Sequence, residues 1–265
     1  MGTREISPPK ELKDSSGLIV GGTAGIGLAT AVGLAQAGAP RIMIVGRNPE
    51  RGQSAAERIS SANSSCEVTF LSADATTVDG AAHIASEAER ILGGVDILVS
   101  TTAADTRPEV FANIPTDDIA RIFNQLALRC MYLASEIVPH MTVRKGGVII
   151  NVASDAAKTA TPGESVIGAA KAAIVMFTRT LAIEAKRNGI RVNVLTPSLV
   201  AGTGSTERIT SDGFSAKLFA KAAQQAHLGV PESEDLAALA VFLASPAARR
   251  LTGQAISVNG GISAA

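Results

Sequence analysis

The chain has 265 residues, of which 46% are hydrophobic and 18% charged, a composition that supports a buried core and excludes intrinsic disorder. Lysine plus arginine equals aspartate plus glutamate at 24 each, so no net charge attracts nucleic acid or an anionic membrane surface, and we expect a small-molecule ligand. Cys66 and Cys130 are too few for a disulfide framework or a cysteine-based zinc site, which predicts a reducing, cytoplasmic location.

The first 15 residues form a polar extension that contains Pro8, Pro9 and charges of both signs. This extension has no apolar core of the kind that a signal peptide needs. No run of eighteen apolar residues occurs later in the chain, so we expect no membrane span.

Short runs rich in Val and Ile alternate with longer Ala-rich segments of helical period almost to the C-terminus. The predicted strands are Gly17–Val20, Arg41–Val45, Glu67–Leu71, Val95–Ser100, Gly147–Val152, Ile190–Leu195 and Ala255–Val258. The predicted helices include Gly25–Ala37, Val78–Leu92, Thr116–Met141, Glu164–Arg187 and Ser233–Ala244. Because such crossovers are right-handed, the pattern predicts one α/β domain over residues 1–265, a doubly wound seven-stranded parallel sheet with helices on both faces.

One segment interrupts this alternation. Residues 196–228 follow the sixth strand and contain Pro197 and three glycines, with only a weak helical pattern. A long loop at the carboxyl end of a strand is often a functional lid, so residues 198–228 are the predicted substrate lid.

A glycine-rich loop joins the first strand to the first long helix. It contains Gly21, Thr23, Gly25, Ile26 and Gly27 in the spacing G-x-x-x-G-x-G. Backbone N–H groups at such a helix N-terminus can bind a pyrophosphate, and glycine permits close approach. The spacing differs from G-x-G-x-x-G, and a simple tight turn is the alternative, but the strand–helix–strand context favours nucleotide binding.

Further features follow the loop in order along nearly the whole chain. They are Asp74 after the third strand, Asp96–Val99, Ser154 after the fifth strand, Lys171, Ile190–Asn193 with Pro197, and Leu251–Gln254 with Asn259–Gly261. Together they resemble the short-chain dehydrogenase/reductase family. The resemblance implies a Rossmann fold, an NAD(P)(H) cofactor and a homotetramer or homodimer.

Cofactor choice depends on the end of the second strand, where an acid would accept a hydrogen bond from the ribose 2′-hydroxyl and select NAD. Here Gly46 is followed by Arg47, whose guanidinium can bind the 2′-phosphate, so we predict NADP(H), with NAD(H) as the alternative. A solvated arginine that opens the next helix would look the same. Asp74 resembles the family residue that contacts the adenine, although a strand-end cap would also be an aspartate.

The catalytic pattern departs from the family. The resemblance implies a Tyr four residues before the Lys and a Ser thirteen residues before the Tyr. Counting back from Lys171 gives Ile167 and then Ser154, so the register holds but the Tyr is absent. The family's helical Asn falls on Leu126. Asn124 lies about 200° away on a regular helix and would need a bulge to replace it.

Other departures cluster at the nicotinamide end. The family's Asn-Asn-Ala-Gly is Ser100–Ala103 here, and its Pro-Gly is Pro197-Ser198. The Thr that would hold the carboxamide aligns with Gly202, with Thr203 adjacent. We expect Lys171, Pro197 and Thr203 to contact the cofactor, and Ser154 and Lys171 to be catalytic.

Substitutes for the missing Tyr are few. Tyr132, the single tyrosine, lies about 240° round the helix from Leu126 and is expected to pack elsewhere. A desolvated Lys171, Asp155 or Glu164 can transfer protons, although each also has an ordinary structural interpretation. His83, His140 and His227 lack metal-ligand spacing, so no zinc is expected.

Three hypotheses remain open. The first is an NADP(H)-dependent oxidoreductase acting on an alcohol, carbonyl or enone, in which Ser154 orients the substrate. The second is a non-redox cyclase, dehydratase or isomerase on the same scaffold, and the third is a non-catalytic nucleotide-binding homologue. Fold alone does not choose among them.

Overall fold

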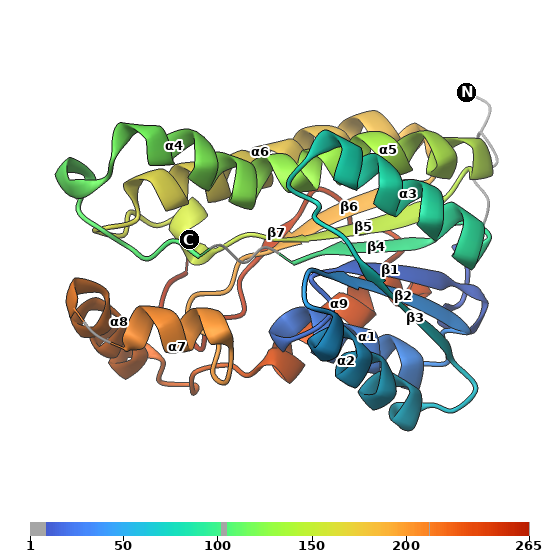
Figure 1. The fold of residues 1–265 in the computed structure, drawn as a ribbon, viewed down its shortest axis with the longest axis horizontal. Helices are drawn as coiled ribbons and strands as arrows, with labels where there is room; N and C mark the ends of the chain where they lie inside the picture. The colour runs from blue at the N-terminus through green and yellow to red at the C-terminus, as the bar shows by residue number, and fades with distance from the viewer. Residues whose placement is uncertain (1–8, 102–104, 212, 265) are drawn as a thin grey trace.

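The computed structural model describes residues 9–101, 105–211 and 213–264. Within these ranges seven parallel strands form one sheet in the order β3-β2-β1-β4-β5-β6-β7, which confirms the predicted doubly wound fold (Figure 1). The strands are β1 (Ser16–Val20), β2 (Arg41–Gly46), β3 (Glu67–Ser72), β4 (Ile97–Ser100), β5 (Gly147–Val152), β6 (Ile190–Leu195) and β7 (Ala255–Ile256). Strand β1 pairs with β2 on one side and β4 on the other, so the strand order reverses there and opens a crevice beyond the carboxyl ends.

Helices cover both faces of the sheet, as Figure 1 shows. One face carries α1 (Gly25–Gln36), α2 (Pro49–Ala62) and α9 (Ser233–Ala244), and the other carries α3 (Val78–Leu92), α4 (Thr116–Phe123), α5 (Arg129–Arg144) and α6 (Ser165–Ala185). Short 3-10 turns lie at η1 (Leu12–Asp14), η2 (Phe111–Asn113), η4 (Asp155–Ala157), η5 (Lys186–Asn188) and η6 (Pro246–Ala248). Helix α2 follows Arg47, and only Gly52, Ala55, Ala56 and Ile59 of its fourteen residues are buried.

Alternation along the strands divides the core between the two faces. Ile19, Ile42 and Ile44 belong to the cluster beneath α1, α2 and α9, whereas Leu18 and Met43 belong to the cluster beneath α3 and α5. Successive side chains point to opposite faces of a strand, so both faces of the central strands must be apolar. The strand prediction succeeded for this reason.

Several strand boundaries differ from the prediction. Strands β1, β2 and β3 are each one residue longer than predicted, and β4 begins at Ile97 rather than Val95. Strand β7 has two residues, Ala255 and Ile256, instead of the four predicted.

Helix α6 is the longest helix among the described residues. Its extension from Ser165 to Asn188 has the length and composition of a membrane span, with 39% of its most apolar window buried. Its buried residues Val166, Ala170 and Ile174 pack in a core cluster with Leu126 of the neighbouring helical layer. Packing within this fold therefore accounts for the buried part of the apolar surface of α6.

The predicted lid is mostly helical, which corrects the expectation of a long loop. It contains α7 (Gly204–Thr210) and α8 (Gly213–Gln225), which lie below the sheet at the left of Figure 1. Only Ser215 and Phe219 of α8 are buried, and no residue of α7 is. The helical pattern is weak in the sequence because these two helices bury very few residues, so no long apolar stripe marks one face.

Candidate functional site

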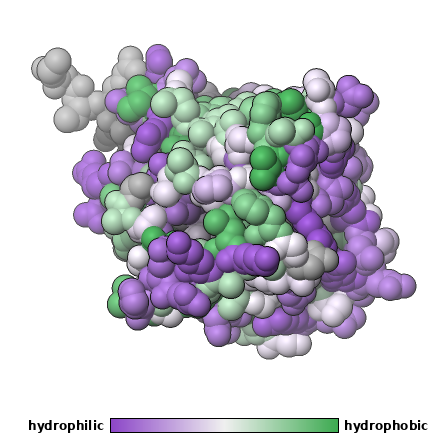
Figure 2. Space-filling model, turned by 90° about the vertical axis from the view of Figure 1, so that its left-hand side faces the viewer, coloured by the Kyte–Doolittle hydropathy of each residue, from purple (hydrophilic) through white to green (hydrophobic). Residues whose placement is uncertain are grey.

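A cleft of about 980 Å³ lies beyond the carboxyl ends of the central strands. Figure 2 looks onto this end of the molecule, where apolar surface lies in a central hollow with hydrophilic side chains around it. All of the residues that we predicted from sequence for the site line this one cleft: Gly21, Thr23, Gly25, Ile26, Gly27, Arg47, Asp74, Ser154, Lys171, Pro197 and Thr203. The fold thus brings together positions that are spread over more than 180 residues of sequence.

The glycine loop forms one wall of the cleft. Gly21 has a φ of +85°, and a Cβ on Gly27 would lie 2.3 Å from the Gly21 carbonyl oxygen, so neither position tolerates a side chain. The N-cap of α1 is Ala24, which offers no side-chain acceptor. The first N–H groups of α1 therefore lack a capping side chain at the edge of the cleft, where they favour a bound anion.

The end of β2 carries a small residue for a packing reason. A Cβ on Gly46 would lie 2.6 Å from Cγ2 of Thr23 in the glycine loop. Arg47 follows and lines the cleft, close enough to Asp74 for its charge to act on that carboxylate. No side chain larger than glycine fits at position 46 unless Thr23 moves.

Asp74 is engaged locally. Its Oδ1 accepts hydrogen bonds from the backbone N–H of Thr76 at 2.9 Å and from the Thr76 hydroxyl at 2.8 Å. Burial acts to raise the pKa of Asp74, but the Thr76 hydrogen bonds and the nearby Arg47 and Arg129 charges outweigh it and lower the pKa. Asp74 therefore caps a turn at the end of the third strand and also lines the cleft.

A π-helical turn interrupts the predicted continuous helix Thr116–Met141. It spans Asn124–Leu128 between α4 and α5. Gln125, Leu126 and Arg129 line the cleft, whereas Asn124 is not among the described residues that do. Asn124 needed such a bulge to replace Leu126, and the π turn supplies the bulge while Leu126, not Asn124, lines the cleft among the described residues.

The π turn leaves polar atoms buried. Among the described residues, Oε1 of Gln125 and Nε of Arg129 have no hydrogen-bond partner. The Arg129 guanidinium donates a 2.7 Å hydrogen bond to the Thr101 carbonyl oxygen at the end of β4. Burial lowers the pKa of Arg129, whereas the negative charge of the Asp74 carboxylate acts to raise it. Sequence reasoning missed Gln125 and Arg129, because a regular helix would turn them to other faces.

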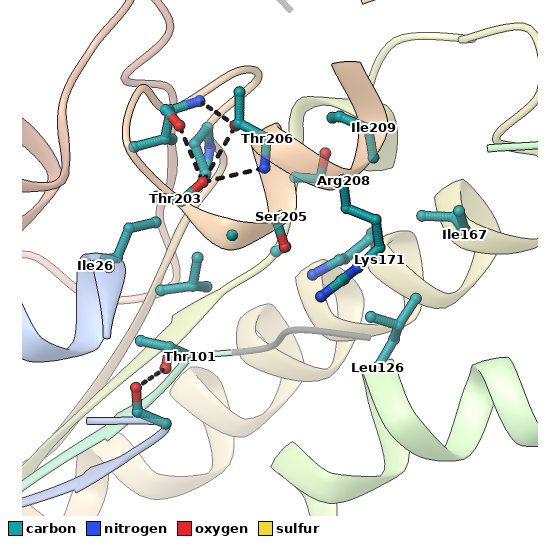
Figure 3. A pocket seen from close by; sticks show the side chains of 18 of the residues that line it. Ile26, Thr101, Leu126, Ile167, Lys171, Thr203, Ser205, Thr206, Arg208 and Ile209 are labelled. Carbon is teal, nitrogen blue, oxygen red and sulfur yellow. Dashed lines mark hydrogen bonds between the residues drawn. The ribbon is translucent and has the colours of Figure 1, made fainter. Parts of the chain in front are cut away.

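Ser154 and Lys171 lie where the sequence placed them. Ser154 follows β5 as the N-cap of η4, and its Oγ accepts a 3.3 Å hydrogen bond from the Ala156 N–H. Lys171 is 6% exposed on α6, and burial lowers its pKa to about 8. Ile167 lines the cleft one turn before Lys171, and Leu126 lines it from the facing π turn (Figure 3).

The lid contributes to the opposite wall. Thr203 caps α7, where its Oγ1 accepts from the Thr206 N–H at 3.3 Å and donates to the Val200 carbonyl at 3.0 Å. Arg208 extends from α7 toward Lys171 and Leu126, as Figure 3 shows. The lid therefore adds a cation to the Lys171 end of the cleft that sequence reasoning did not identify.

Several other candidates lie outside the cleft. Tyr132 packs against the core cluster beneath α3 and α5, in agreement with prediction. Within the described ranges no group of three His, Cys, Asp or Glu side chains is placed to hold a metal ion. Cys66 and Cys130 are buried free thiols, and Thr102 and Ala103 lie outside the described residues.

A family model described as enoyl-(acyl carrier protein) reductase matches residues 21–263, almost the whole sheet and cleft. A 3-oxoacyl-(acyl-carrier-protein) reductase of Chlamydia pneumoniae is 33% identical over 245 residues, covering 92% of this chain and 95% of the relative. The chain belongs to the short-chain dehydrogenase/reductase family. The similar members of this family are named as dehydrogenases and reductases, which supports oxidoreductase activity for this chain.

Other relatives in the family extend the comparison. The gluconate 5-dehydrogenase of Gluconobacter oxydans is 32% identical and covers 95% of each chain. The structure of L-sorbose reductase from Gluconobacter frateurii with NADPH and L-sorbose has a TM-score of 0.84 and 30% identity, covering 94% of this chain and 96% of its own. A 7α-hydroxysteroid dehydrogenase with NADH and 7-oxo glycochenodeoxycholic acid has a TM-score of 0.86 and 26% identity, with 95% of each chain covered. Family members thus bind either nicotinamide cofactor.

Proposed function

We propose that the chain is an NADP(H)-dependent oxidoreductase of the cytoplasm that acts on an alcohol, carbonyl or enone through an atypical active site. The observation that carries this proposal is the single cleft that contains every site residue predicted from the sequence. The proposed domain spans residues 1–265, with residues 198–228 as the substrate lid, and its polar extension includes residues 1–8, which lie outside the described ranges.

The cleft suits a dinucleotide. The uncapped α1 N-terminus beside Gly21 and Gly27 provides donors for a diphosphate. Asp74, which lines the same cleft, is the residue proposed to contact the adenine. A nicotinamide cofactor, when bound, supplies or accepts a hydride. The residues of this chain bind and orient it, with Lys171 at the ribose and Pro197 and Thr203 at the nicotinamide end.

The preference for NADP(H) has steric and electrostatic support. An acid that selects NAD would fit at position 46 only if Thr23 moved, because its Cβ would lie 2.6 Å from Cγ2 of Thr23. The next residue is Arg47, a cation that suits a 2′-phosphate. The NADPH complex of L-sorbose reductase, at 30% identity, is consistent with this choice.

The proposed active site lacks the tyrosine of the family. Ile167 occupies the position four residues before Lys171, and Leu126 occupies the position of the helical Asn. Both apolar side chains line the cleft beside the buried Lys171. Ser154 orients the substrate oxygen, and the low-dielectric surroundings keep the Lys171 ammonium easy to deprotonate.

We also propose a homodimer or homotetramer. Met176 and Ile183 are 60% and 61% exposed on α6, seven residues apart and therefore on one face of the helix. Large exposed apolar side chains in a row on one helix favour contact with another chain.

Titration with NADPH and NADH, followed by cofactor fluorescence, tests the proposal directly, because the chain has no Trp and a single Tyr. Micromolar binding with preference for NADPH is the expected result. A screen of alcohols, carbonyls and enones then follows both cofactor oxidation and products formed without it. Absence of binding by either cofactor, reduced or oxidised, contradicts the proposal.

A further inference from the structure

Glu164 lies at the start of α6 and lines the cleft. Its backbone is held on both sides, since its N–H donates a 3.0 Å hydrogen bond to Thr161 and its carbonyl accepts from the Gly168 N–H. The preceding Gly163 has a φ of +83°, and a Cβ there would lie 2.6 Å from Phe214 of α8. The backbone of Glu164 is thus held in place next to α8 of the lid.

Glu164 is the N-cap of α6, Ile167 and Lys171 follow it on the helix, and all three line the cleft. Seven residues of a regular helix span about 700° of rotation and roughly 10.5 Å, so position 171 follows position 164 on nearly the same side of the helix axis. Side chains lean toward the N-terminus of a helix, which points the long Lys171 side chain toward Glu164. The two charges act on each other, because Lys171 lowers the pKa of Glu164 and Glu164 raises that of Lys171. Ile167 lies between them and carries no ionisable group.

The surroundings of Glu164 favour its protonated form. Burial raises the pKa of Glu164 to about 7, the Asp155 carboxylate of η4 adds to this, and Lys171 opposes it. Three other charged residues line the same cleft: Arg129 at the start of α5, Arg208 of α7, and Asp105. The Glu109 backbone N–H donates a 2.8 Å hydrogen bond to the Gly163 carbonyl, next to Glu164. Asp155 is held differently, because its Oδ1 accepts a 2.6 Å hydrogen bond from Ser263.

We propose that Glu164 is the proton donor and acceptor of this active site, in the role that Ile167 cannot fill. The proposal rests on the proposed oxidoreductase function. In carbonyl reduction, the substrate carbon accepts the hydride from the reduced nicotinamide, and the C=O π electrons move to oxygen, which takes the proton of Glu164. The carboxylate then regains a proton from water at the mouth of the cleft. Alcohol oxidation runs the same transfers in reverse.

The principal test replaces Glu164 by Gln, which preserves shape but carries no acidic proton. NADPH-dependent reduction of butane-2,3-dione, used as a reactive carbonyl probe, should fall at least about 100-fold in kcat, with KM and the Kd for NADPH changed less than about threefold. Wild-type kcat should fall as pH rises through about 7, and this limb should vanish in Glu164→Gln. The matched control is Glu184→Gln on the exposed surface of α6, which should leave the profile unchanged.

A second readout requires no turnover. In protein labelled with ¹³C at the glutamate carboxyl carbons, one resonance should titrate with a pKa near 7 and should be absent in Glu164→Gln but present in Glu184→Gln. Glu164→Asp, which keeps the acid but shortens the side chain, should recover part of kcat and the pH limb. It also serves if Glu164→Gln does not fold.

The outcomes separate this proposal from the proposed function. Normal NADPH binding with kcat within threefold of wild type in Glu164→Gln, or a Glu164 carboxyl that titrates below pH 5, overturns the role of Glu164 and leaves the oxidoreductase intact. Failure of the wild type to bind any nicotinamide cofactor overturns both, and the fluorescence titration detects it independently.

Discussion

Arg129, the first residue of α5 after the π turn, is joined to Thr101 at the end of β4, since its guanidinium donates a 2.7 Å hydrogen bond to the Thr101 carbonyl oxygen. Thr101 in turn donates its hydroxyl to the Val20 and Gly21 carbonyls at 3.0 and 3.1 Å. The glycine loop, the central strands and the π turn are thereby connected. A guanidinium whose Nε has no partner within the described residues faces the cleft at this junction.

Replacement of Arg129 by Met should weaken NADPH binding about tenfold, because the cleft proposed to bind the anionic cofactor loses a partly buried cation together with its support of Thr101. Arg121→Met, which changes an arginine of α4 outside the cleft lining, is the control. Fluorescence titration measures both. Equal affinity in Arg129→Met and wild type would show that the guanidinium has no cofactor role.

Arg47→Ala should weaken NADPH binding by about 10- to 100-fold and NADH binding by less than threefold, because only NADPH carries the 2′-phosphate. Arg58→Ala on α2, outside this cleft, should change neither affinity. Parallel titrations give the ratio. A similar loss for both cofactors would remove Arg47 from the 2′-phosphate.

Ile167→Tyr should raise turnover by about tenfold or more and restore activity in the Glu164→Gln background, because it supplies a proton donor one helical turn from Lys171. Ile167→Phe provides the matched aromatic control without the hydroxyl. Lys171→Ala should lower turnover. Steady-state kinetics at fixed pH checks all of them, and unchanged turnover in both Ile167→Tyr and Lys171→Ala would refute the roles assigned to these positions.

Stability should depend on pH through Glu164. Burial raises its pKa from 4.5 to about 7, so the folded state binds this proton more tightly than the unfolded state does. The resulting contribution is fully present below pH 4.5 and is lost as pH rises through 7, amounting to about 3 kcal/mol. Chemical denaturation from pH 4.5 to 8 should show this loss in wild type and Glu184→Gln, and a smaller one in Glu164→Gln. Identical pH dependence in all three would contradict a raised pKa at Glu164.

Charge on the outer face of α6 should disrupt the proposed oligomer. The double variant Met176→Lys and Ile183→Lys places two cations at positions that are 60% and 61% exposed, so the fold of one chain should tolerate them. Light scattering after size exclusion should show a dimer or tetramer for wild type and a monomer for the variant. Arg179→Ala, on the same exposed stretch, tests whether any surface change suffices.

Local physics allowed the fold to be predicted. Apolar β-branched runs such as Gly147–Val152 and Ile190–Leu195 have one stable use, as strands covered on both faces, and both were predicted with correct bounds. The Gly21–Gly27 loop was recognisable because close backbone approach demands glycine at fixed places. Both signals arise from residues that are close together along the chain, so the sequence alone is enough to detect them.

The tertiary structure decided which side chains share the cleft. A π turn at Asn124–Leu128 turns Gln125 and Arg129 inward, and no residue pattern announced that change of register. The space that excludes a side chain at Gly46 belongs to Thr23, which lies 23 residues away. Glu164 gains its raised pKa from burial and from Asp155 of another element. By itself, the sequence determined the strands, the glycine loop and the absence of a Tyr four residues before Lys171. Contacts between distant segments determined the packing of the cleft side chains and the protonation of Glu164 and Lys171, because burial and electrostatic surroundings exist only once the chain has folded.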